Sequence, residues 1–415
     1  MNLGDKDKSF IWHPFTPMAE WCSDASEPLV IERGDGVYIY DNLGRQYIDG
    51  NASIWTNVHG HCHPRINEAI TKQIGSIAHC SFLGTTNEPA ILLAERLIGL
   101  FPSKSLERVF FSDDGSTAIE CAMKMAVQYF QIKGQSERCR FVTFGNAYHG
   151  DTLGASSLGG VERFFSRFSD LGLPVIHLNS QEELNEVNCE EIAAIVLEPL
   201  VQGAAGIRLW PDGMLKQIRD WCDAHQVLLI LDEVMTGFGR TGRMFACEHE
   251  DVIPDIMALA KGLTGGYLPL AATLTTGEIF NAFLDEENTF YYGHSYSGNP
   301  VGCAAALASL KIFEEEEALS DLPEKINYLS KALEQLKTEN HKVIDVRQCG
   351  LIAGIEILGN GEIIGPEVCS IARDYGLLTR AIGNTVVFMP PLVINNEQIS
   401  NSMCALQTAI NKVVG

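Results

Sequence analysis

The middle of this chain alternates short, apolar, β-branched runs with longer helical patterns. VLLILDE (227–233) is the clearest apolar run, and RFVTF (140–144) and IAAIVLEP (192–199) have the same character. The segments between such runs place apolar residues at helical spacing. Strands separated by helices in this way predict an α/β fold with a mostly parallel sheet that helices cover on both faces.

The two ends of the chain have a different pattern. Residues 28–50 alternate around the turn sequences GDG and DNLG, which predicts a small antiparallel meander. Beyond residue 305, a long helical pattern precedes the strand-like segments 343–358 and 386–394. We therefore predict a large α/β domain over residues 61–304 and a smaller α+β domain built from residues 1–60 and 305–415.

The charge and the cysteines exclude several classes of protein. A formal net charge of −23 over 415 residues argues against binding to nucleic acid and to anionic membranes. No apolar run nears the length of a membrane-spanning helix, and MNLGDKDKSF is too charged for a signal peptide. The 12 cysteines are scattered and form no C-x-x-C motif, as expected in a reducing compartment. These features predict a cytoplasmic protein.

Three candidate functional groups lie where strands of the predicted sheet end, which is where ligands bind in α/β folds. Gly115 and Ser116 stand between RVFFS (108–112) and a helix, so they could bind a phosphate or serve only as a helix cap. Asp232 ends the apolar run 227–231, and its carboxylate could belong to a site or to a structural ion pair.

Lys261 is the third group, and it follows DIMALA (255–260). It could be a surface lysine, but its small apolar neighbours would desolvate the amine and lower its pKa, as a Schiff-base lysine requires. An anion site, an acid and a lysine at strand ends together suit pyridoxal phosphate, which needs a lysine, a phosphate site and an acid at its pyridine nitrogen. The combination is more specific than any single member.

Two other motifs suggest different chemistry. GFGRTG (237–242) matches the dinucleotide-binding pattern, but five residues separate it from its strand and a poor helix follows, so a nicotinamide enzyme is disfavoured. HGHCHP (59–64) could bind a metal or form a turn before a helix, and no cysteine pair or acid completes a ligand set. We therefore predict no metal site.

Longer segments resemble a known family. LILDEVMTGFGRTGRMFACEHE, PDIMALAKGLTGGYLPLAA and GHSYSGNP resemble the class III, fold-type I aminotransferases that depend on pyridoxal phosphate, and the likeness runs from Trp12 to the C-terminus. Within this family, WHPFTPM and SIWTNVHGH are similar to the branch that aminates 8-amino-7-oxononanoate in biotin biosynthesis. In that branch the aromatic segment IWHPFTPMAEW (11–21) would fold over the active site.

The resemblance implies a role for each matching residue. Lys261 would bind the cofactor covalently and transfer a proton, and Asp232 would pair with the pyridine nitrogen. The other implied cofactor contacts are the phosphate ligands Gly115 and Ser116, the residues on the two ring faces, Tyr148 and Val234, and His294 and Ser295 from a second subunit of a homodimer.

The implied substrate contacts are Phe15, Ile54, Trp55, Tyr148, Gly293 and the carboxylate-binding Arg380. Members that use S-adenosylmethionine as amino donor commonly have tyrosine at position 15 and tryptophan at position 54. Phe15 and Ile54 therefore favour lysine slightly as the donor. The alternatives are a broad-specificity ω-aminotransferase acting on diamines or β-amino acids, a nicotinamide oxidoreductase, and a non-catalytic regulator that binds the cofactor.

Overall fold

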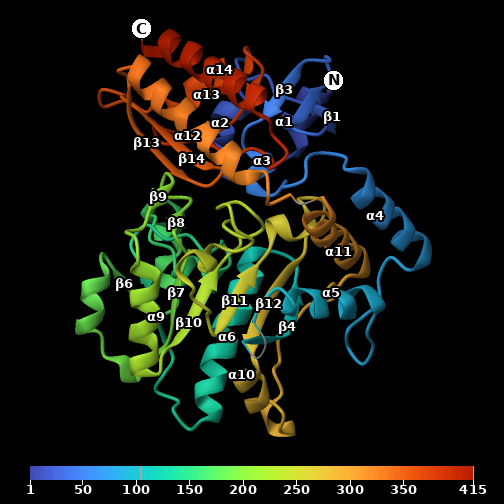
Figure 1. Ribbon diagram of the computed structural model, residues 1–415, viewed down its shortest axis with the longest axis vertical. Coiled ribbons are helices and arrows are strands. Elements are labelled where there is room, and N and C mark those ends of the chain that lie inside the picture. The colour runs from blue at the N-terminus through green and yellow to red at the C-terminus, as the bar shows by residue number, and fades with distance from the viewer. Residues whose placement is uncertain (103–104, 317, 415) are drawn as a thin grey trace.

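The computed structural model describes residues 1–102, 105–316 and 318–414. A seven-stranded sheet with its helices forms the lower part of the molecule in Figure 1, and two four-stranded sheets form the upper part. Both ends of the chain lie in the upper part. No helix in the described part of the chain is long and apolar enough to cross a membrane.

The large sheet is mostly parallel. Its strands, in spatial order, are β4 (Leu106–Ser112), β12 (Ala271–Thr276), β11 (Ile256–Leu259), β10 (Leu228–Asp232), β7 (Ile192–Leu197), β5 (Arg140–Phe144) and β6 (Val175–Leu178). Only β12 runs against its two neighbours, β11 and β4. The prediction of an α/β fold with a mostly parallel sheet is confirmed.

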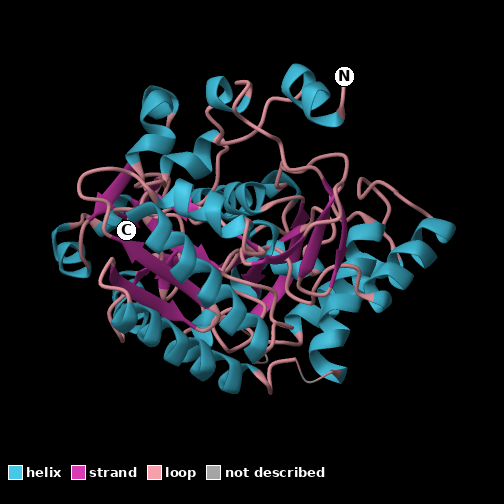
Figure 2. Cartoon of the chain, turned by 90° about the horizontal axis from the view of Figure 1, so that it is seen from above, coloured by secondary structure: helices cyan, strands magenta, loops and turns pink. Residues whose placement is uncertain are grey.

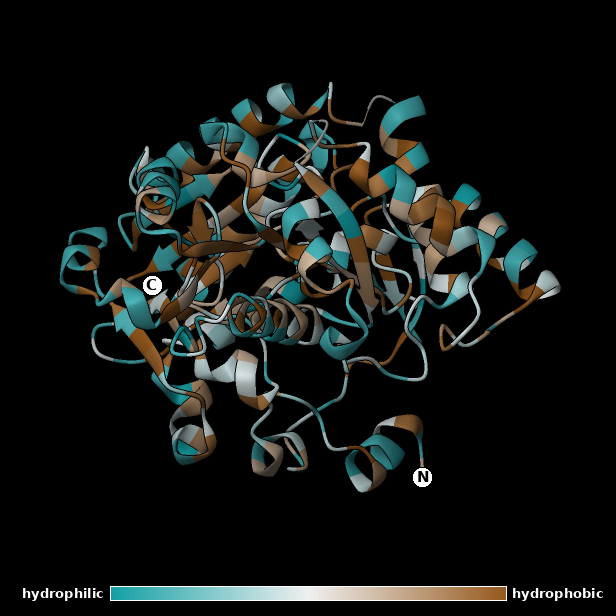
Figure 3. Ribbon diagram, turned by 90° about the horizontal axis from the view of Figure 1, so that it is seen from below, coloured by the Kyte–Doolittle hydropathy of each residue, from teal (hydrophilic) through white to brown (hydrophobic). Residues whose placement is uncertain are grey.

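The two faces of this sheet carry separate clusters of apolar side chains, as period-two alternation requires. Val196 and Ile230 pack with helix α6 (Gly115–Ile132), whereas Leu197 and Leu229 pack with helix α9 (Met214–His225). Figure 3 shows mostly brown strands in the interior, surrounded by helices that carry both teal and brown segments. Burial on both faces explains why the strands are continuous apolar runs in the sequence.

Further helices and short strands cover or flank the large sheet. They are α4 (Pro64–Ser76), α5 (Glu88–Ile98), α7 (Leu153–Ser157), α8 (Glu162–Phe165), α10 (Gly277–Ala282), α11 (Pro300–Glu315), β8 (Val201–Gln202) and β9 (Arg208–Leu209).

The upper region combines segments from both ends of the chain. Its first sheet contains the meander β1 (Ile31–Asp35), β2 (Tyr38–Asp41) and β3 (Gln46–Asp49), together with β15 (Leu377–Leu378), which pairs with β3 in parallel. Its second sheet contains β13 (Val343–Cys349), β14 (Ile352–Ile357), β17 (Thr385–Phe388) and β16 (Ala381–Ile382). The helices are α12 (Leu322–Glu339), α13 (Gly365–Arg373) and α14 (Asn396–Val414).

The segment 386–394 is strand only as far as Phe388, where β17 ends. Pro390 and Pro391 follow, and proline has no N–H with which to continue a ladder. The expectation of a strand over this whole segment was therefore wrong in its second half.

The first 27 residues form a peripheral segment, which we call the N-terminal segment. Its helices α1 (Leu3–Phe10) and α2 (Met18–Trp21) contain no buried residue, and Figure 2 shows α1 standing apart from the strands. Polar contacts hold the segment together, since the carboxylate of Asp7 accepts hydrogen bonds from Trp21 Nε1 at 2.7 Å and His13 Nε2 at 3.0 Å.

Candidate active site

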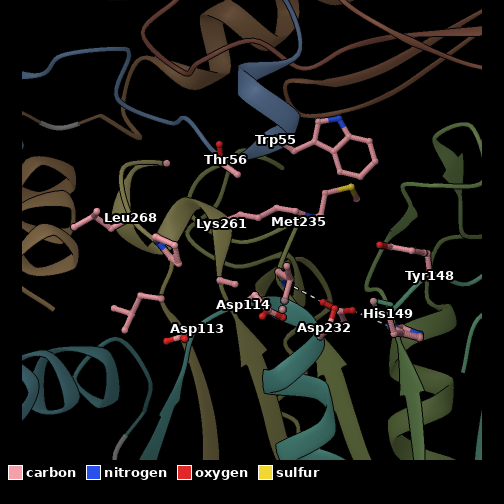
Figure 4. Close-up of a pocket in the computed structure, with 18 of the residues that line it drawn as sticks. Trp55, Thr56, Asp113, Asp114, Tyr148, His149, Asp232, Met235, Lys261 and Leu268 are labelled. Atoms are coloured by element: carbon pink, nitrogen blue, oxygen red, sulfur yellow. Dashed lines mark hydrogen bonds and ion pairs between the residues drawn. The ribbon is translucent and has the colours of Figure 1, made fainter. Parts of the chain in front are cut away.

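A cavity of about 460 Å³ lies at the carboxyl edge of the large sheet. Loops that follow β4, β5, β7, β10 and β11 form its floor and sides, and a turn after β3 forms its roof (Figure 4). Seven of the predicted residues line it: Trp55, Gly115, Ser116, Tyr148, Asp232, Val234 and Lys261.

Lys261 follows β11 and extends into this cavity (Figure 4). Burial lowers the pKa of its amine, and the carboxylates of Asp232 and Glu198 oppose that shift. Its backbone has a φ of 43°, a strained value for a residue with a side chain. The indole ring of Trp55 lies over the amine, with 5.1 Å between Nζ and the ring centroid. A lysine in this setting is suited to act as a nucleophile or a base.

Asp232 ends β10 and faces a buried histidine. Its Oδ2 accepts a hydrogen bond from His149 Nδ1 at 2.8 Å, and its Oδ1 accepts one from the Val234 N–H at 3.1 Å. The Nε2 of His149 is buried and has no partner within the described residues. The pair therefore holds a carboxylate in a fixed orientation at the cavity wall.

Glu198 is a second buried carboxyl group in the wall, directly after β7. It accepts hydrogen bonds from the N–H groups of Gly203 at 2.8 Å and Tyr148 at 3.3 Å. Burial raises the pKa of Glu198 to about 7, against the attraction of His149 and with the added repulsion of Asp232.

The N-terminus of α6 opens into the cavity between β4 and β10. Asp114 caps this helix by accepting from the Thr117 N–H at 3.0 Å, and the Ser116 hydroxyl accepts from the Asp151 N–H at 3.1 Å. A Cβ at position 115 would lie 2.8 Å from Val234 Cγ1, so only glycine fits here. The helix start thus offers free N–H groups beside a hydroxyl, an arrangement that binds phosphate.

The roof of the cavity is a left-handed turn, α3 (Ala52–Trp55). Its four residues have φ values of 43°, 50°, 65° and 68°, and none is glycine. Left-handed backbone costs about 1–2 kcal/mol per such residue. The turn directs Trp55, which is 9% exposed, into the cavity, whereas Ile54 is 46% exposed and is not among the lining residues.

The other predicted residues lie outside the cavity lining. Arg380 is exposed in the loop between β15 and β16, and Gly293, His294 and Ser295 are exposed in one loop. The Nδ1 of His294 lies 3.5 Å from the carboxylate of Asp113, which does line the cavity.

Phe15 lies outside the cavity and is connected to it through the rings of Phe164 and Tyr148. It is 57% exposed, and its ring packs edge-on against Phe164 with 5.6 Å between the centroids. Phe164 packs in the same way against Tyr148 at 5.9 Å. This series of rings connects the N-terminal segment to a residue that lines the cavity.

The two competing motifs are structural in this fold. The first helical element after GFGRTG is a short 3-10 helix, Ala246–Glu250. The buried guanidinium of Arg240 donates to the carbonyl oxygens of Asn57 at 2.7 Å and Pro390 at 2.5 Å. In HGHCHP the histidines have separate partners, since His59 contacts Ser309 and His61 contacts Asp49. Within the described residues, no three potential metal ligands form a group.

Sequence reasoning missed His149 and Glu198. Both could have been found by the argument that located Asp232, because each follows the carboxyl end of a buried strand, β5 and β7 respectively. The missed residues complete a buried group of two carboxyl groups and one imidazole on one side of Lys261.

Comparison with known proteins agrees with this geometry. The family model "Aminotransferase class-III" matches residues 22–410. The chain is 46% identical to the adenosylmethionine-8-amino-7-oxononanoate aminotransferase of Geobacter sulfurreducens, with 100% of this chain and 98% of the relative covered. It is 44% identical to the enzyme of the same name from Aquifex aeolicus, with 98% and 96% covered.

Solved structures agree as well. The enzyme of that name from Methanocaldococcus jannaschii superimposes with a TM-score of 0.95 at 42% identity, covering 100% of this chain and 99% of that one. The ω-transaminase of Pseudomonas jessenii in complex with PMP gives a TM-score of 0.93 at 30% identity, with 100% and 98% covered. The chain therefore belongs to the class III aminotransferases, enzymes that depend on pyridoxal phosphate.

Proposed function

We propose that this aminotransferase transfers an amino group to 8-amino-7-oxononanoate, giving 7,8-diaminononanoate in biotin biosynthesis. The observation that carries the proposal is the full-length identity of 41–46% to several relatives named for that acceptor. The ω-transaminase structures share the fold but only 30–32% of the sequence.

The cavity residues fit the cofactor. Pyridoxal phosphate, when bound, supplies an electron sink for the bonds at the substrate carbon. We propose that the N-terminus of α6, with Gly115 and Ser116, binds its phosphate, and that Asp232 pairs with its pyridine nitrogen. His149 orients that carboxylate through the hydrogen bond to Oδ2. Tyr148 and Val234 would contact the two faces of the ring.

Lys261 would perform the proton transfers of the reaction. Its amine extends into the cavity, and burial lowers its pKa, which favours the neutral Nζ that would take a proton from the substrate carbon and deliver it to the cofactor carbon. The indole of Trp55 covers this amine from the upper side and excludes water from it.

The substrate side is formed by apolar walls and one cation. Trp55 and Tyr148 line the cavity, and we propose that Ile54, Phe15 and Gly293 border its entrance. Arg380 would bind the terminal carboxylate of the acceptor with two parallel hydrogen bonds.

Two amino donors are candidates. The relatives carry adenosylmethionine in their names, which supports that donor. Phe15 and Ile54 support lysine, because they replace the tyrosine and tryptophan common in members that use S-adenosylmethionine. The donor is settled by the experiment below.

We further propose a cytoplasmic homodimer in which His294 and Ser295 complete the phosphate site of the partner. The scattered cysteines suit a reducing compartment. Large apolar side chains exposed near this loop support a subunit interface, since Leu83 is 93% and Tyr291 88% exposed. Sedimentation equilibrium would show a mass of two chains.

The experiment follows the visible spectrum of the purified, cofactor-loaded enzyme. Lysine or S-adenosylmethionine is added separately, and 8-amino-7-oxononanoate is then supplied. We expect one donor to bleach the visible band and the keto acid to restore it, with 7,8-diaminononanoate formed in equal amount. Recovery with general keto acids or diamine-derived carbonyl compounds, but not with 8-amino-7-oxononanoate, would contradict the proposal and identify a general ω-aminotransferase.

A further inference from the structure

The left-handed turn that forms the cavity roof is held by side chains for which the proposed function has no role. Asp49 precedes the turn, and its Oδ2 accepts hydrogen bonds from the Ser53 hydroxyl and from His61 Nε2, both at 2.9 Å. At its far end, the Asn57 carbonyl accepts from the buried guanidinium of Arg240. The strained backbone is thus restrained on both sides.

Asn51 acts on the ring itself. Its Oδ1 accepts a hydrogen bond from the indole Nε1–H of Trp55 at 2.9 Å, and its main-chain oxygen accepts from the Trp55 N–H at 2.8 Å. Asn51 is 6% exposed and Trp55 is 9% exposed, so water cannot readily replace the side-chain contact. One residue therefore fixes both the backbone and the ring plane of Trp55.

The indole fits tightly between two surfaces. On one side, a Cβ at position 203 would clash with Sδ of Met235 and lie 3.1 Å from Cζ3 of Trp55, so a larger residue there would crowd both side chains. Met235 belongs to the same apolar cluster and also lines the cavity. On the cavity side stands the Lys261 amine, 5.1 Å from the ring centroid. A rotation of the ring would therefore change the shape of the cavity and the cover over Lys261.

We propose that Asn51 is a positioning residue that sets acceptor affinity by holding the indole of Trp55 as the wall of the cavity. Without the amide oxygen, a buried N–H is left unpaired, and the ring turns towards another acceptor or water. The apolar chain of the acceptor then loses its fixed wall. The identity of that acceptor rests on the proposed function, whereas the action of Asn51 on the ring does not.

A double-mutant cycle tests this inference. Asn51→Leu keeps the volume and removes the acceptor, and Trp55→Phe removes the donor. We expect Asn51→Leu to raise KM for the acceptor about tenfold with kcat within about twofold, the effect of one unpaired buried group. In the Trp55→Phe background the same substitution should change KM by less than about twofold, because no N–H remains to be held.

Two variants separate positioning from general stability. Asn51→Asp retains an acceptor oxygen and should restore KM to within about threefold of wild type. Asn340→Leu is the matched control, since Asn340 is 3% exposed and donates from Nδ2 to Asn411 Oδ1 at 2.9 Å, far from the cavity. It should lower the melting temperature and leave KM unchanged.

A readout without turnover completes the test. In the cofactor-free protein, Asn51→Leu should weaken the near-ultraviolet circular dichroism of tryptophan, and neither Asn340→Leu nor Asn51→Leu in the Trp55→Phe background should do so. If Asn51→Leu does not fold, Asn51→Ala takes its place in the cycle.

The inference is overturned if the two substitutions are additive in KM and in the tryptophan signal. It is also overturned if Asn340→Leu raises KM as much as Asn51→Leu does. Failure of the wild-type enzyme to use 8-amino-7-oxononanoate would reject the proposed function alone. In that case the cycle is measured with the acceptor that the enzyme does use, and the dichroism still decides the role of Asn51.

Discussion

The floor of the cavity and the N-terminal segment are held by different forces. On the floor, Asp232 is 5% and Glu198 6% exposed. Each accepts one hydrogen bond from the loop after β5 and one from the segment that follows its own strand. In the N-terminal segment no residue of α1 or α2 is buried, and Trp12 is 88% exposed. The floor is fixed by the sheet, whereas the segment is held by a few polar contacts and one series of rings.

This difference suits the two roles that we propose, reaction chemistry for the floor and substrate recognition for the N-terminal segment. Groups that must be oriented before the substrate arrives belong on rigid elements, because reorganisation during the reaction would raise its barrier. Groups that admit and cover a substrate belong on parts of low local stability. Substitutions on the floor should therefore affect kcat, and changes in the segment should affect KM.

Lys261→Ala should have the largest effect, lowering kcat/KM by at least about 10⁴-fold, because it removes the amine that we propose both transfers the proton and binds the cofactor. The matched control is Lys325→Ala, since Lys325 is half-buried, has a lowered pKa and donates to the Leu392 carbonyl at 3.0 Å away from the cavity. The control should retain kcat/KM within about threefold, as expected for a group outside the reaction. Steady-state kinetics decide, and a Lys261→Ala enzyme within 100-fold of wild type would assign the chemistry elsewhere.

Asp232→Asn should come next, lowering kcat by about 100-fold or more, the usual effect of losing one preorganised electrostatic contact. Asp255→Asn is its counterpart at the opposite edge of the sheet, where Asp255 accepts from the Leu229 N–H at 2.7 Å and from Arg219 at 2.8 Å. That control should lower the melting temperature without lowering kcat. Equal loss of kcat in both variants would mean that Asp232 acts only through stability.

The sequence predicted much of the floor and little of the roof. Asp232 and Lys261 could be located because a buried parallel strand is a continuous apolar run, and the polar residue that ends it lies at the ligand-binding edge. The left-handed turn over Ala52–Trp55 could not be predicted. Positive φ values are usually signalled by glycine, and none of these four residues is glycine. The loop with His294 and the site of Arg380 depend on tertiary placement, and their proposed roles rest on family resemblance.

Glu198→Gln should have an intermediate effect, on stability and with a defined pH dependence. Burial raises the pKa of Glu198 to about 7, so the native state binds its proton more tightly than the unfolded chain does. This contribution to stability is fully present below pH 4.5 and is lost as the pH rises through 7. Between pH 5 and pH 8 the glutamine variant should therefore lose less stability than wild type, by about 2–3 kcal/mol in the cofactor-free protein.

Urea unfolding at pH 5 and pH 8 measures this difference. The variant should still lose part of its free energy of unfolding between pH 5 and pH 8, because burial also raises the pKa of Glu233 to about 7. If the free energy of unfolding depends on pH in the same way in Glu198→Gln as in wild type, Glu198 is ionised at neutral pH and this prediction is wrong.

Removal of residues 1–27 should have the smallest effect on stability, with a change in melting temperature below about 2 °C, because no helix of this segment buries a side chain. KM for the acceptor should rise about fivefold, the size of one aromatic contact, because we propose that Phe15 borders the entrance of the cavity. Differential scanning fluorimetry and steady-state kinetics measure the two quantities. A fall of 10 °C would show that the segment is part of the folded core.

The pairing of strands also determines when each strand can find its partner during synthesis on the ribosome. The edge strand β4 is hydrogen-bonded to β12, and β3 is hydrogen-bonded to β15, so early segments depend on partners made much later. Translation of the chain between Ser112 and Ala271 takes roughly 8–30 seconds. During that time the strand LERVFFS has no partner strand. Its unpaired N–H and C=O groups can then pair with strands of other nascent chains. The unpaired edge of β4 is therefore exposed until β12 has emerged.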